Sequence, residues 1–386
     1  RITPDASGGS IEAVLTTMAG VSSKNEMSTQ YMVRGGSYDE NSVYINGIEV
    51  YRPQLISNGQ QEGLSIINPD MVGSVKFSTG GFGAEYADKM SSALDIRYRD
   101  PEAFEGSAAL SLQGGSLSLG QSSKRFSQLH GFRFKRNSGL LGSLEDKGEY
   151  DPKYFDYQTF MNWAINSKWK LSVLGNISMN NYRFTPETRE TSFGTSTNAK
   201  SFKVYFDGFE KDRFETFFGA MSLSFNPNKN HSYTLMASGY KTNELVTYDI
   251  HGEYWLDEAG GSNSSGDQVG GELGVGKYHE HERNRLKASV LAITLKGSNK
   301  IANNLISYGA TIQRESIFEN SRQWEWRDSA GYSLPHLPEE VNVIYSQASN
   351  HDFGSTRFAA YLQDTYKLAS SAGYFTINGG VRLSYW

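Results

Sequence analysis

Two histidines at alternate positions, His279 and His281, come nearest in this sequence to the type and spacing that metal chemistry requires. Alternate side chains of an extended strand leave the same face, so the two imidazoles could form a clasp for a transition metal. Two imidazoles at a solvated junction between a loop and a strand also occur without any metal. We therefore assign no metal site and keep this pair as a candidate.

Other groupings of polar residues fall short of a cation site or a catalytic site. Asp257, Glu258 and Asp267 flank a stretch rich in Gly and Ser and could hold calcium. Their spacing is not that of an EF-hand loop, and a flexible loop explains the stretch more simply. The glycine-rich run 80–83 lacks the Lys and Ser or Thr of a phosphate loop, and no Ser-His-Asp motif supports catalysis. The sequence predicts neither an enzyme nor a bound cofactor.

The composition narrows the class of protein. The chain has 386 residues, 40 Gly, 23 Tyr, 21 Phe and no Cys, and its mean hydropathy is -0.52. No apolar run approaches the ~18 residues of a spanning helix, which excludes a helical membrane protein but fits a barrel with one apolar face. The lack of Cys excludes a disulfide framework and a thiolate metal site. A net charge of -5 without blocks of Lys and Arg argues against nucleic acid as a partner.

The first hundred residues have the pattern of a small α+β unit. Ser10 can cap a short amphipathic helix that ends before Gly20, because the apolar residues between them recur at helical spacing. Asn46 and Gly47 can form the turn of a hairpin, since both residue types accept positive φ. These patterns alone are equally compatible with an ordinary small α+β domain.

The rest of the chain has the pattern of successive strands. In one of them, Val173 and Ile177 lie on one face and Asn176 on the other. Lipid-facing and lumen-facing residues alternate in this way in a membrane barrel, but a soluble sandwich strand with one buried face shows the same alternation. We predict eleven strands, at 105–113, 115–122, 125–137, 153–165, 168–184, 212–225, 231–250, 282–297, 303–321, 352–368 and 373–386.

The lengths of the connections distinguish these two alternatives. Short connections alternate with long ones from the third strand onward, without exception. Outer-membrane barrels have short periplasmic turns and long extracellular loops, so the alternation favours a membrane barrel. The short connections lie near 166–167, 226–230, 298–302 and 369–372, and the long ones near 138–152, 185–211, 251–281 and 322–351.

The N-terminal segments, taken in order, resemble the plug domain of a TonB-dependent outer-membrane receptor. Asn46 departs from the family pattern, where Asp is usual, and so does Ala87, where Gly is usual, but neither disturbs the order of the elements. The matching segments are Met18-Ala19-Gly20-Val21 after the helix, Arg34-Gly35-Gly36 after a strand, the hairpin 43–50, the strand and glycine-rich bend 74–81 followed by Tyr86, and the closing strand 93–96.

The resemblance implies the fold and its division into domains. It predicts an α+β plug domain in residues 1–103, followed in residues 104–386 by the N-terminal half of an antiparallel transmembrane β-barrel. Eleven strands would be half of a 22-stranded plugged transporter. The remaining strands are then expected after Trp386 and the TonB box before Arg1.

The resemblance also indicates where recognition would occur. The Arg of the RG motif, here Arg34, is expected to form an ion pair with the barrel wall and to lock the plug in place; an exposed Arg at a strand end is the alternative. Aromatic residues of long external loops could stack on a ligand: Trp255, Trp324 and Trp326. Two polar loops at the plug apex are the expected ligand contacts: Asn25, Glu26, Gln30, Tyr51, Arg52, Gln54, Asn58, Gln60 and Gln61.

The function implied by the resemblance is energised import of a scarce ligand across the outer membrane of a Gram-negative bacterium. The plug would gate the barrel lumen, and the expected partners are the outer-membrane lipid, the TonB energising complex and a surface lipoprotein. The alternative is a plugged barrel that acts as a surface receptor or as an assembly subunit bound to a lipoprotein or to secretion machinery, without transport. The fold does not select the imported ligand.

Overall fold

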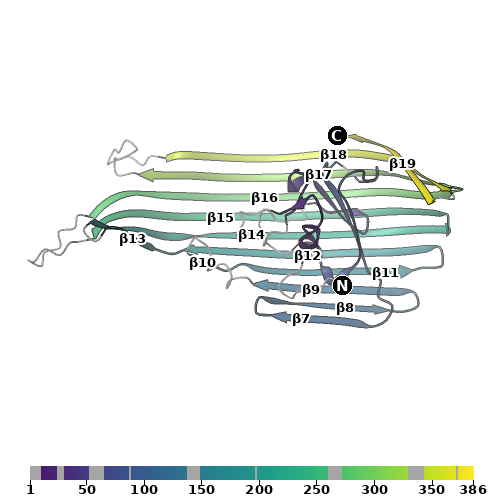
Figure 1. Ribbon diagram of the computed structural model, residues 1–386, viewed down its shortest axis with the longest axis horizontal. Coiled ribbons are helices and arrows are strands. Elements are labelled where there is room, and N and C mark those ends of the chain that lie inside the picture. Colours follow the sequence, from purple (N-terminus) through teal and green to yellow (C-terminus); the bar gives the residue numbers. More distant parts are fainter. Residues whose placement is uncertain are drawn as a thin grey trace, which may run out of the picture.

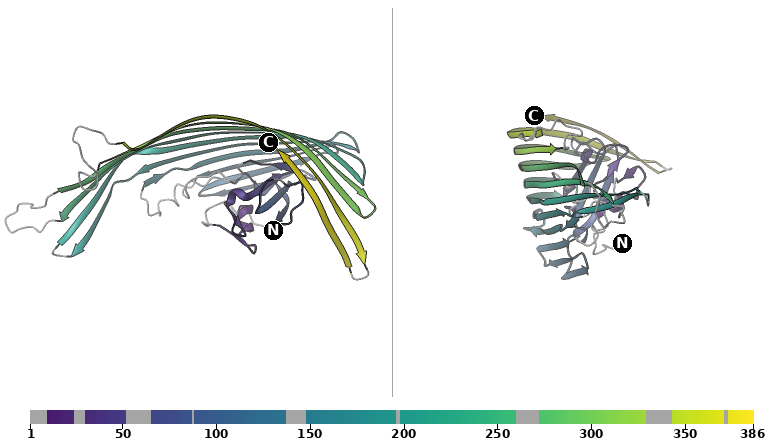
Figure 2. Two further views of the ribbon diagram at one scale, coloured as in Figure 1. Left: turned by 90° about the horizontal axis from the view of Figure 1, so that it is seen from above. Right: turned by 90° about the vertical axis from the view of Figure 1, so that its left-hand side faces the viewer.

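A computed structural model of the chain describes residues 10–23, 30–51, 65–86, 88–136, 148–195, 198–259, 272–328, 343–370 and 373–386. A small N-terminal unit, residues 10–98, lies against the concave face of a long curved sheet, called the wall below (Figure 1). Seen from above, the wall bends around this unit, so that the unit contacts one face of the wall (Figure 2).

The N-terminal unit is built on a four-stranded sheet in the order β4-β3-β6-β5, in which β3 and β6 are parallel. Tyr31, Met71, Leu94 and Ile96 are fully buried in its core. Its elements are α1 (Ile11–Leu15), β1 (Val21–Ser22), β2 (Met32–Val33), the 3-10 helix η1 (Tyr38–Glu40), β3 (Asn41–Ile45), β4 (Ile48–Glu49), the 3-10 helix η2 (Pro69–Met71), β5 (Val72–Ser78) and β6 (Ser92–Tyr98).

The helix and the hairpin of this unit form where the sequence predicts them. The backbone N–H of Ala13 donates to Ser10 Oγ over 3.1 Å, and Asn46 and Gly47 make the turn with φ of 52° and 78°. The helix is shorter than predicted. The hydroxyls of Thr16 and Thr17 bond to backbone carbonyls three residues earlier, and such local bonds compete with helical ones.

The wall is antiparallel throughout and contains 13 strands, 11 of them in one continuous path from β7 to β19. Two short strands, β10 and β13, pair beside β12 and β14. The bounds are β7 (Glu105–Ser111), β8 (Gly114–Ser122), β9 (Phe126–Arg136), β10 (Gly148–Tyr150), β11 (Lys153–Ala164), β12 (Trp169–Pro186), β13 (Arg189–Thr195), β14 (Asn198–Asn228), β15 (His231–Ala259), β16 (Glu272–Ile301), β17 (Asn304–Asp328), β18 (Val343–Ser370) and β19 (Gly373–Tyr385).

The continuous path confirms the eleven predicted strands, but several of them are longer than predicted. β14 has 31 residues and β15 has 29, because residues assigned to long loops continue the ladder on both sides. Short connections at 165–168, 229–230 and 302–303 gather at one end of the wall, away from the extended ends of these strands (Figure 1). No helix in the described part of the chain is long and apolar enough to span a membrane.

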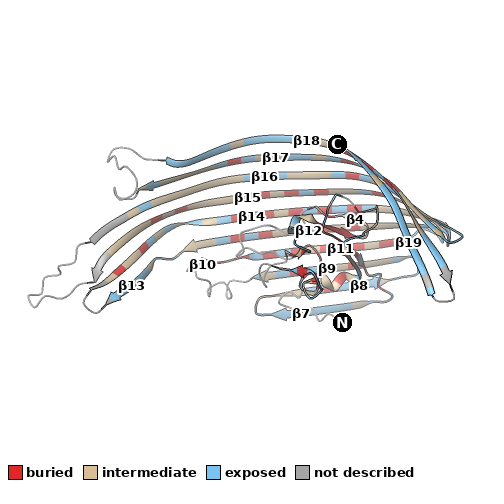
Figure 3. Cartoon of the chain, turned by 45° about the horizontal axis from the view of Figure 1, so that its top comes forward, coloured by how far each residue is buried: buried red, intermediate tan, exposed pale blue. Residues whose placement is uncertain are grey.

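The two faces of the wall differ in chemistry. Buried residues concentrate where the wall covers the N-terminal unit (Figure 3). The opposite, convex face carries large apolar side chains that remain exposed near the short connections. We call this set the apolar belt: Ile177, Phe217, Met221, Leu235, Leu291, Ile293, Leu295, Ile312, Phe358 and Leu362. Counted in cross-strand rows, it extends from the row of Phe217 to the row that joins Phe225 and Leu362, about nine residues along a strand and close to the length that crosses a bilayer.

An arginine introduced on the convex, apolar face should destabilise the protein in lipid, whereas an arginine introduced on the concave face should have little effect on stability. Ile177→Arg, and Val173→Arg beside Met221 on the same face, are each expected to destabilise the protein folded in lipid by about 2 to 4 kcal/mol, because the guanidinium would face hydrocarbon. Ser178→Arg, on the concave face of the same strand, is the control and should change it by less than about 1 kcal/mol. Equal losses at both faces in a vesicle folding assay would contradict the assignment of faces.

Candidate functional site: the interface between the N-terminal unit and the wall

The N-terminal unit and the wall share one hydrophobic core. Side chains of β9, β11, β12, β14 and β15 pack in the same cluster as α1 and the four-stranded sheet. The wall residues of this cluster are Leu129, Phe160, Leu174, Phe218, Ala220, Met236 and Tyr240. Polar contacts at either side of this core decide how firmly the unit is held.

An arginine of the wall holds the unit on one side. Arg133 on β9 donates to the backbone carbonyls of Ser65 and Ile67 over 2.7 and 2.9 Å. It also pairs with Asp156 on β11 at 2.9 Å, and the side chains of both partners are at most 10% exposed. Guanidinium forms such charge-assisted bonds readily because its donors lie in a fixed plane.

Neighbouring amides complete this arrangement. Asn176 on β12 donates to Asp156 Oδ2 over 2.8 Å, and Gln158 donates to the same carboxylate and to the carbonyl of Ile66. The hydroxyl of Tyr98 donates in turn to Gln158. We call Arg133, Asp156, Gln158 and Asn176 the clamp. Three successive carbonyls of the unit, at positions 65 to 67, therefore accept bonds from the wall.

The clamp is connected to the N-terminal helix through a buried carboxyl group. The hydroxyl of Ser65 donates to Glu12 on α1, and the backbone N–H of Ile67 donates to Ser65 Oγ over 3.0 Å. Glu12 is only 2% exposed, and burial raises the pKa of its carboxyl, although Ser65 and Arg133 oppose this effect. A displacement of the helix would thus break a contact that orients the clamped segment.

Glu12 should make the stability of the unit depend on pH. A carboxyl with a raised pKa in the folded state stabilises fully below the unfolded value of 4.5, and this contribution is lost as pH rises through the folded pKa. Glu12→Gln should therefore slow hydrogen exchange in residues 65–71 at pH 8 but have little effect at pH 4. Slowing of equal size at both pH values would show that the ionisation of Glu12 is not the cause.

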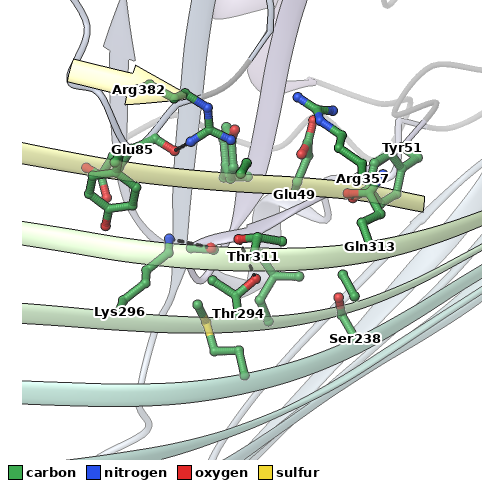
Figure 4. Close-up of a pocket in the computed structure, with 17 residues that line it drawn as sticks. Glu49, Tyr51, Glu85, Ser238, Thr294, Lys296, Thr311, Gln313, Arg357 and Arg382 are labelled. Atoms are coloured by element: carbon green, nitrogen blue, oxygen red, sulfur yellow. Dashed lines mark hydrogen bonds between the residues drawn. The ribbon is translucent and has the colours of Figure 1, made fainter. Parts of the chain in front are cut away.

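A small polar cavity separates the unit from β15 to β19 on the other side (Figure 4). It measures about 60 Å³, room for a few water molecules, and hydroxyls of Ser238, Thr294 and Thr311 line its wall side. Lys296 Nζ donates to the carbonyl of Gly47 over 2.9 Å, and the Tyr51 hydroxyl donates to Gln313 Oε1 over 2.8 Å.

Charged side chains border this cavity. Figure 4 shows Glu49 beside Arg357, with Arg382 and Lys296 further along the same gap. Burial raises the pKa of Glu49, whereas Arg357 and Arg382 act to lower it. Arg357 also pairs with Asp88 of the unit, and Arg382 Nη1 lies 3.4 Å from the carbonyl oxygen of Ala84. On this side, separate polar contacts hold the unit to the wall around a cavity that has room for a few water molecules.

A second cavity of about 370 Å³ continues the gap toward the short connections of the wall. Asp100 accepts there from Lys170 over 3.1 Å and from the amide of Asn162. Ser222, Ser224 and Thr234 form its floor. The interface therefore has a densely bonded side at the clamp and a hydroxyl-lined side at the cavities, an arrangement suited to holding and releasing a domain.

Two of the nine residues expected at the apex fall within the described residues. Tyr51 lines the first cavity, and Gln30 is half-buried just before β2. The other seven lie outside the described residues: Asn25, Glu26, Arg52, Gln54, Asn58, Gln60 and Gln61. Ligand contact at the apex stays a prediction.

Arg34 does not form the expected pair within the described part of the chain. It is exposed, has a φ of 50°, and lies beside Gly20 and Gly80 of its own unit. No described residue of the wall forms an ion pair with it, so its role as a lock stays a prediction. Two buried arginines lie between the described parts of the unit and the wall, Arg133 on β9 and Arg357 on β18, and both come from the wall.

The aromatic residues assigned to external loops lie in strands instead. Trp255 is in β15, and Trp324 and Trp326 are in β17. The ladders extend past the predicted strand ends, which is why the assignment to loops was wrong. His281 stacks on Trp324 at 5.0 Å, with an angle of 9° between the ring planes.

The two candidate metal ligands, His279 and His281, do not form a metal site in the described part of the chain. His279 Nε2 lies 2.7 Å from Asp249 Oδ1. Among the residues that the structure describes, no group of three or more His, Cys, Asp or Glu could hold a metal ion. Asp267, the proposed calcium ligand, lies outside the described residues, and Asp257 and Glu258 end strand β15.

The residues that hold the interface were not singled out from the sequence. A usable signal existed, because Asp156 and Gln158 alternate with aromatic residues on a predicted strand, and so face the lumen. Arg133, at a lumen-facing position of the preceding strand, pairs with Asp156 directly across the ladder. The carbonyls that they bind belong to the backbone and leave no trace in the sequence.

Comparisons with known proteins agree with the resemblance in the N-terminal unit. Residues 4–93 match the family model described as "TonB-dependent Receptor Plug Domain". No curated protein matches the chain.

Solved structures match the chain at low similarity. They include the siderophore receptor PirA from Pseudomonas aeruginosa, at 10% identity and a TM-score of 0.36, over 100% of this chain and 88% of that one. The siderophore receptor PiuA from Acinetobacter baumannii has 10% identity and a TM-score of 0.42, over 89% and 59%. The ferric yersiniabactin uptake receptor FyuA from Yersinia pestis has 10% identity and a TM-score of 0.42, over 94% of this chain and 62% of that one. This chain thus spans less than two thirds of the last two.

Proposed function

Since its plug domain makes this chain a TonB-dependent receptor of the outer membrane, we propose that it imports a scarce ligand by energised displacement of the plug. The observation that supports this function is the two-sided interface between plug and wall. Bonds of the clamp fix residues 65–67, while the hairpin around Gly47 rests over hydroxyl-lined space.

The contacts suggest an order of opening. TonB would pull on the segment before α1, and the first buried bond in that path is the one from Ser65 to Glu12. Loss of this bond would leave the bonds of Arg133 and Gln158 to the carbonyls of residues 65–67 in place. On the other side, the hairpin needs to break its bond to Lys296 before the two cavities merge into a passage. We propose that the ligand is first met by the apical residues, Tyr51 among them.

Plug displacement can be tested without knowing the ligand by labelling one introduced cysteine, since residues 1–386 contain none of their own. In the full-length protein in its membrane, Thr294→Cys places a thiol in the cavity beneath the hairpin. A hydrophilic maleimide should label it several-fold faster in energised cells than after a protonophore. Asn320→Cys, exposed on the convex face of β17, should label equally in both.

A tether between plug and wall supplies the second half of the test. A Cβ on Gly380 would lie 3.0 Å from Cβ of Ala84, so Ala84→Cys with Gly380→Cys can form a disulfide after a small local shift. Oxidation of this pair should abolish the energy-dependent labelling at position 294, and reduction should restore it. A labelling rate at position 294 that changes neither with the protonophore nor with the tether would refute plug displacement as the transport step.

A further inference from the structure

The convex face of the wall changes chemistry in a fixed order with distance from the short connections. The apolar belt comes first. From the upper edge of the belt onward, the four cross-strand rows that run from β14 to β17 carry seven cationic side chains and a single carboxylate, Glu215; they begin with Phe217, Glu215, Arg213 and Lys211. We call the cations the basic band: Lys211, Arg213, Lys241, Arg283, Arg285, Lys287 and Arg322.

Most charges of the basic band are not neutralised by the protein. Arg213 pairs with Glu215, and Arg283 pairs with Asp249 in the next row. Within the described residues, Lys241, Arg285 and Lys287 form no ion pair, and all three are exposed. Lys241 on β15 is paired with Ser289, and Lys287 on β16 is paired with Asn243. The two lysines therefore lie on adjacent strands in neighbouring rows of the same face. Cations this close repel one another unless an anion lies between them.

An aromatic cluster follows immediately above the basic band. Trp324 stacks on His281 and meets His279 edge to face at 4.9 Å. Asp249 holds both imidazoles, at 2.7 Å from His279 and 3.5 Å from His281. The indole face is therefore fixed in place on the convex surface, above the band and away from the plug.

We propose that the convex face of β14 to β17 binds a phosphorylated glycolipid of the outer leaflet. Its acyl chains would lie on the apolar belt, its phosphates on the basic band and its first sugars beside Trp324. The order of acyl chain, phosphate and sugar in such a lipid is the order of the three layers on the protein. This inference takes one premise from the proposed function, namely that the end of the wall with the long strands faces outward. Arg and Lys are the side chains that bind phosphate by charge-assisted bonds.

The other end of the belt lacks a comparable site. Three lysines lie at the short connections: Lys168 just before β12, Lys229 just after β14 and Lys300 next to the last residue of β16. They lie in or beside connections and do not form neighbouring rows on one face. These three lysines therefore supply a control set with the same loss of charge at the opposite side of the membrane.

The test uses the purified full-length protein in detergent and two probes, a rough lipopolysaccharide and the same lipid after enzymatic removal of its phosphates. The variant Lys241→Gln, Arg285→Gln, Lys287→Gln should bind the phosphorylated probe at least about tenfold more weakly than the unmodified protein. The control Lys168→Gln, Lys229→Gln, Lys300→Gln should bind it unchanged. Dephosphorylated probe should bind the unmodified protein no better than the phosphorylated probe binds the triple variant.

Each result decides the proposal. Equal affinity of the unmodified protein and the band variant, or of the two probes, would overturn it. A loss of the same size in the control would show nonspecific attraction and would overturn it as well. Trp324→Ala should weaken binding of lipid that carries core sugars but not of the lipid anchor alone. Binding in detergent needs neither energy nor plug movement, so its outcome is independent of the labelling test.

Discussion

Removal of residues 1–103 from the full-length protein is expected to produce a wide pore that stays open. The plug occupies the concave face of the wall and shares its hydrophobic core, so its loss exposes a lumen lined by polar and small side chains. In planar bilayers, the deletion variant should show a large, steady conductance to small ions, and the intact protein should show almost none. Energy-dependent labelling should disappear in the variant, because it lacks the part that we propose TonB to move.

A matched variant separates plug loss from loss of ligand contact. Replacing Arg52, Asn58 and Gln61 together by Ala truncates polar groups that we propose to face the ligand and leaves the clamp in place. This triple variant should remain closed in bilayers. A deletion variant as impermeable as the intact protein would mean that the plug does not fill the lumen.

Arg133→Ala should be the most damaging single substitution at the interface. It leaves Asp156 buried without its cation and the carbonyls of Ser65 and Ile67 without donors. Loss of one partner of a buried ion pair typically costs about 3 to 5 kcal/mol. We expect the opening free energy of residues 65–71, measured by hydrogen exchange in the full-length protein, to fall by about that amount.

The same strand offers a control for this substitution. Arg136 pairs with Asp151 at 2.7 Å, but its side chain is 52% exposed, so Arg136→Ala should cost less than about 1 kcal/mol. Substituting Asp156 by Leu in the Arg133→Met background should recover part of the loss, since no buried charge then remains. Similar, small losses at Arg133 and Arg136 would mean that the clamp does not hold the plug.

The sequence predicted the strands well where the alternation of side chains was regular. Val173, Gly175 and Ile177 alternate with polar residues, and β12 has the predicted position and faces. Beyond the belt, apolar and polar residues no longer alternate regularly, because both faces of a strand outside the membrane are exposed to water. β14 and β15 were therefore predicted too short, and Trp324 was assigned to a loop.

The interface was harder to predict than the strands. The clamp depends on backbone carbonyls at 65–67 and on side chains from β9, β11 and β12 that come together only after the sheet has formed. Periodicity identifies Asp156 as a lumen-facing residue but cannot show which plug segment lies opposite it. Arg34 illustrates the converse case, in which a motif suggests a partner that no described residue supplies.

The length of the wall strands has a consequence for access to the protein. β15 continues for about 18 residues beyond Lys241, roughly 60 Å along the strand at ~3.3 Å per residue. We therefore expect the plug of the full-length protein to lie at the bottom of a deep antechamber, below the ends of β14 to β17. We expect such a rim to act as a molecular sieve that admits small solutes and holds antibody-sized particles away from the gate. A solute inside it collides with the plug repeatedly before it escapes, which favours capture at low external concentration.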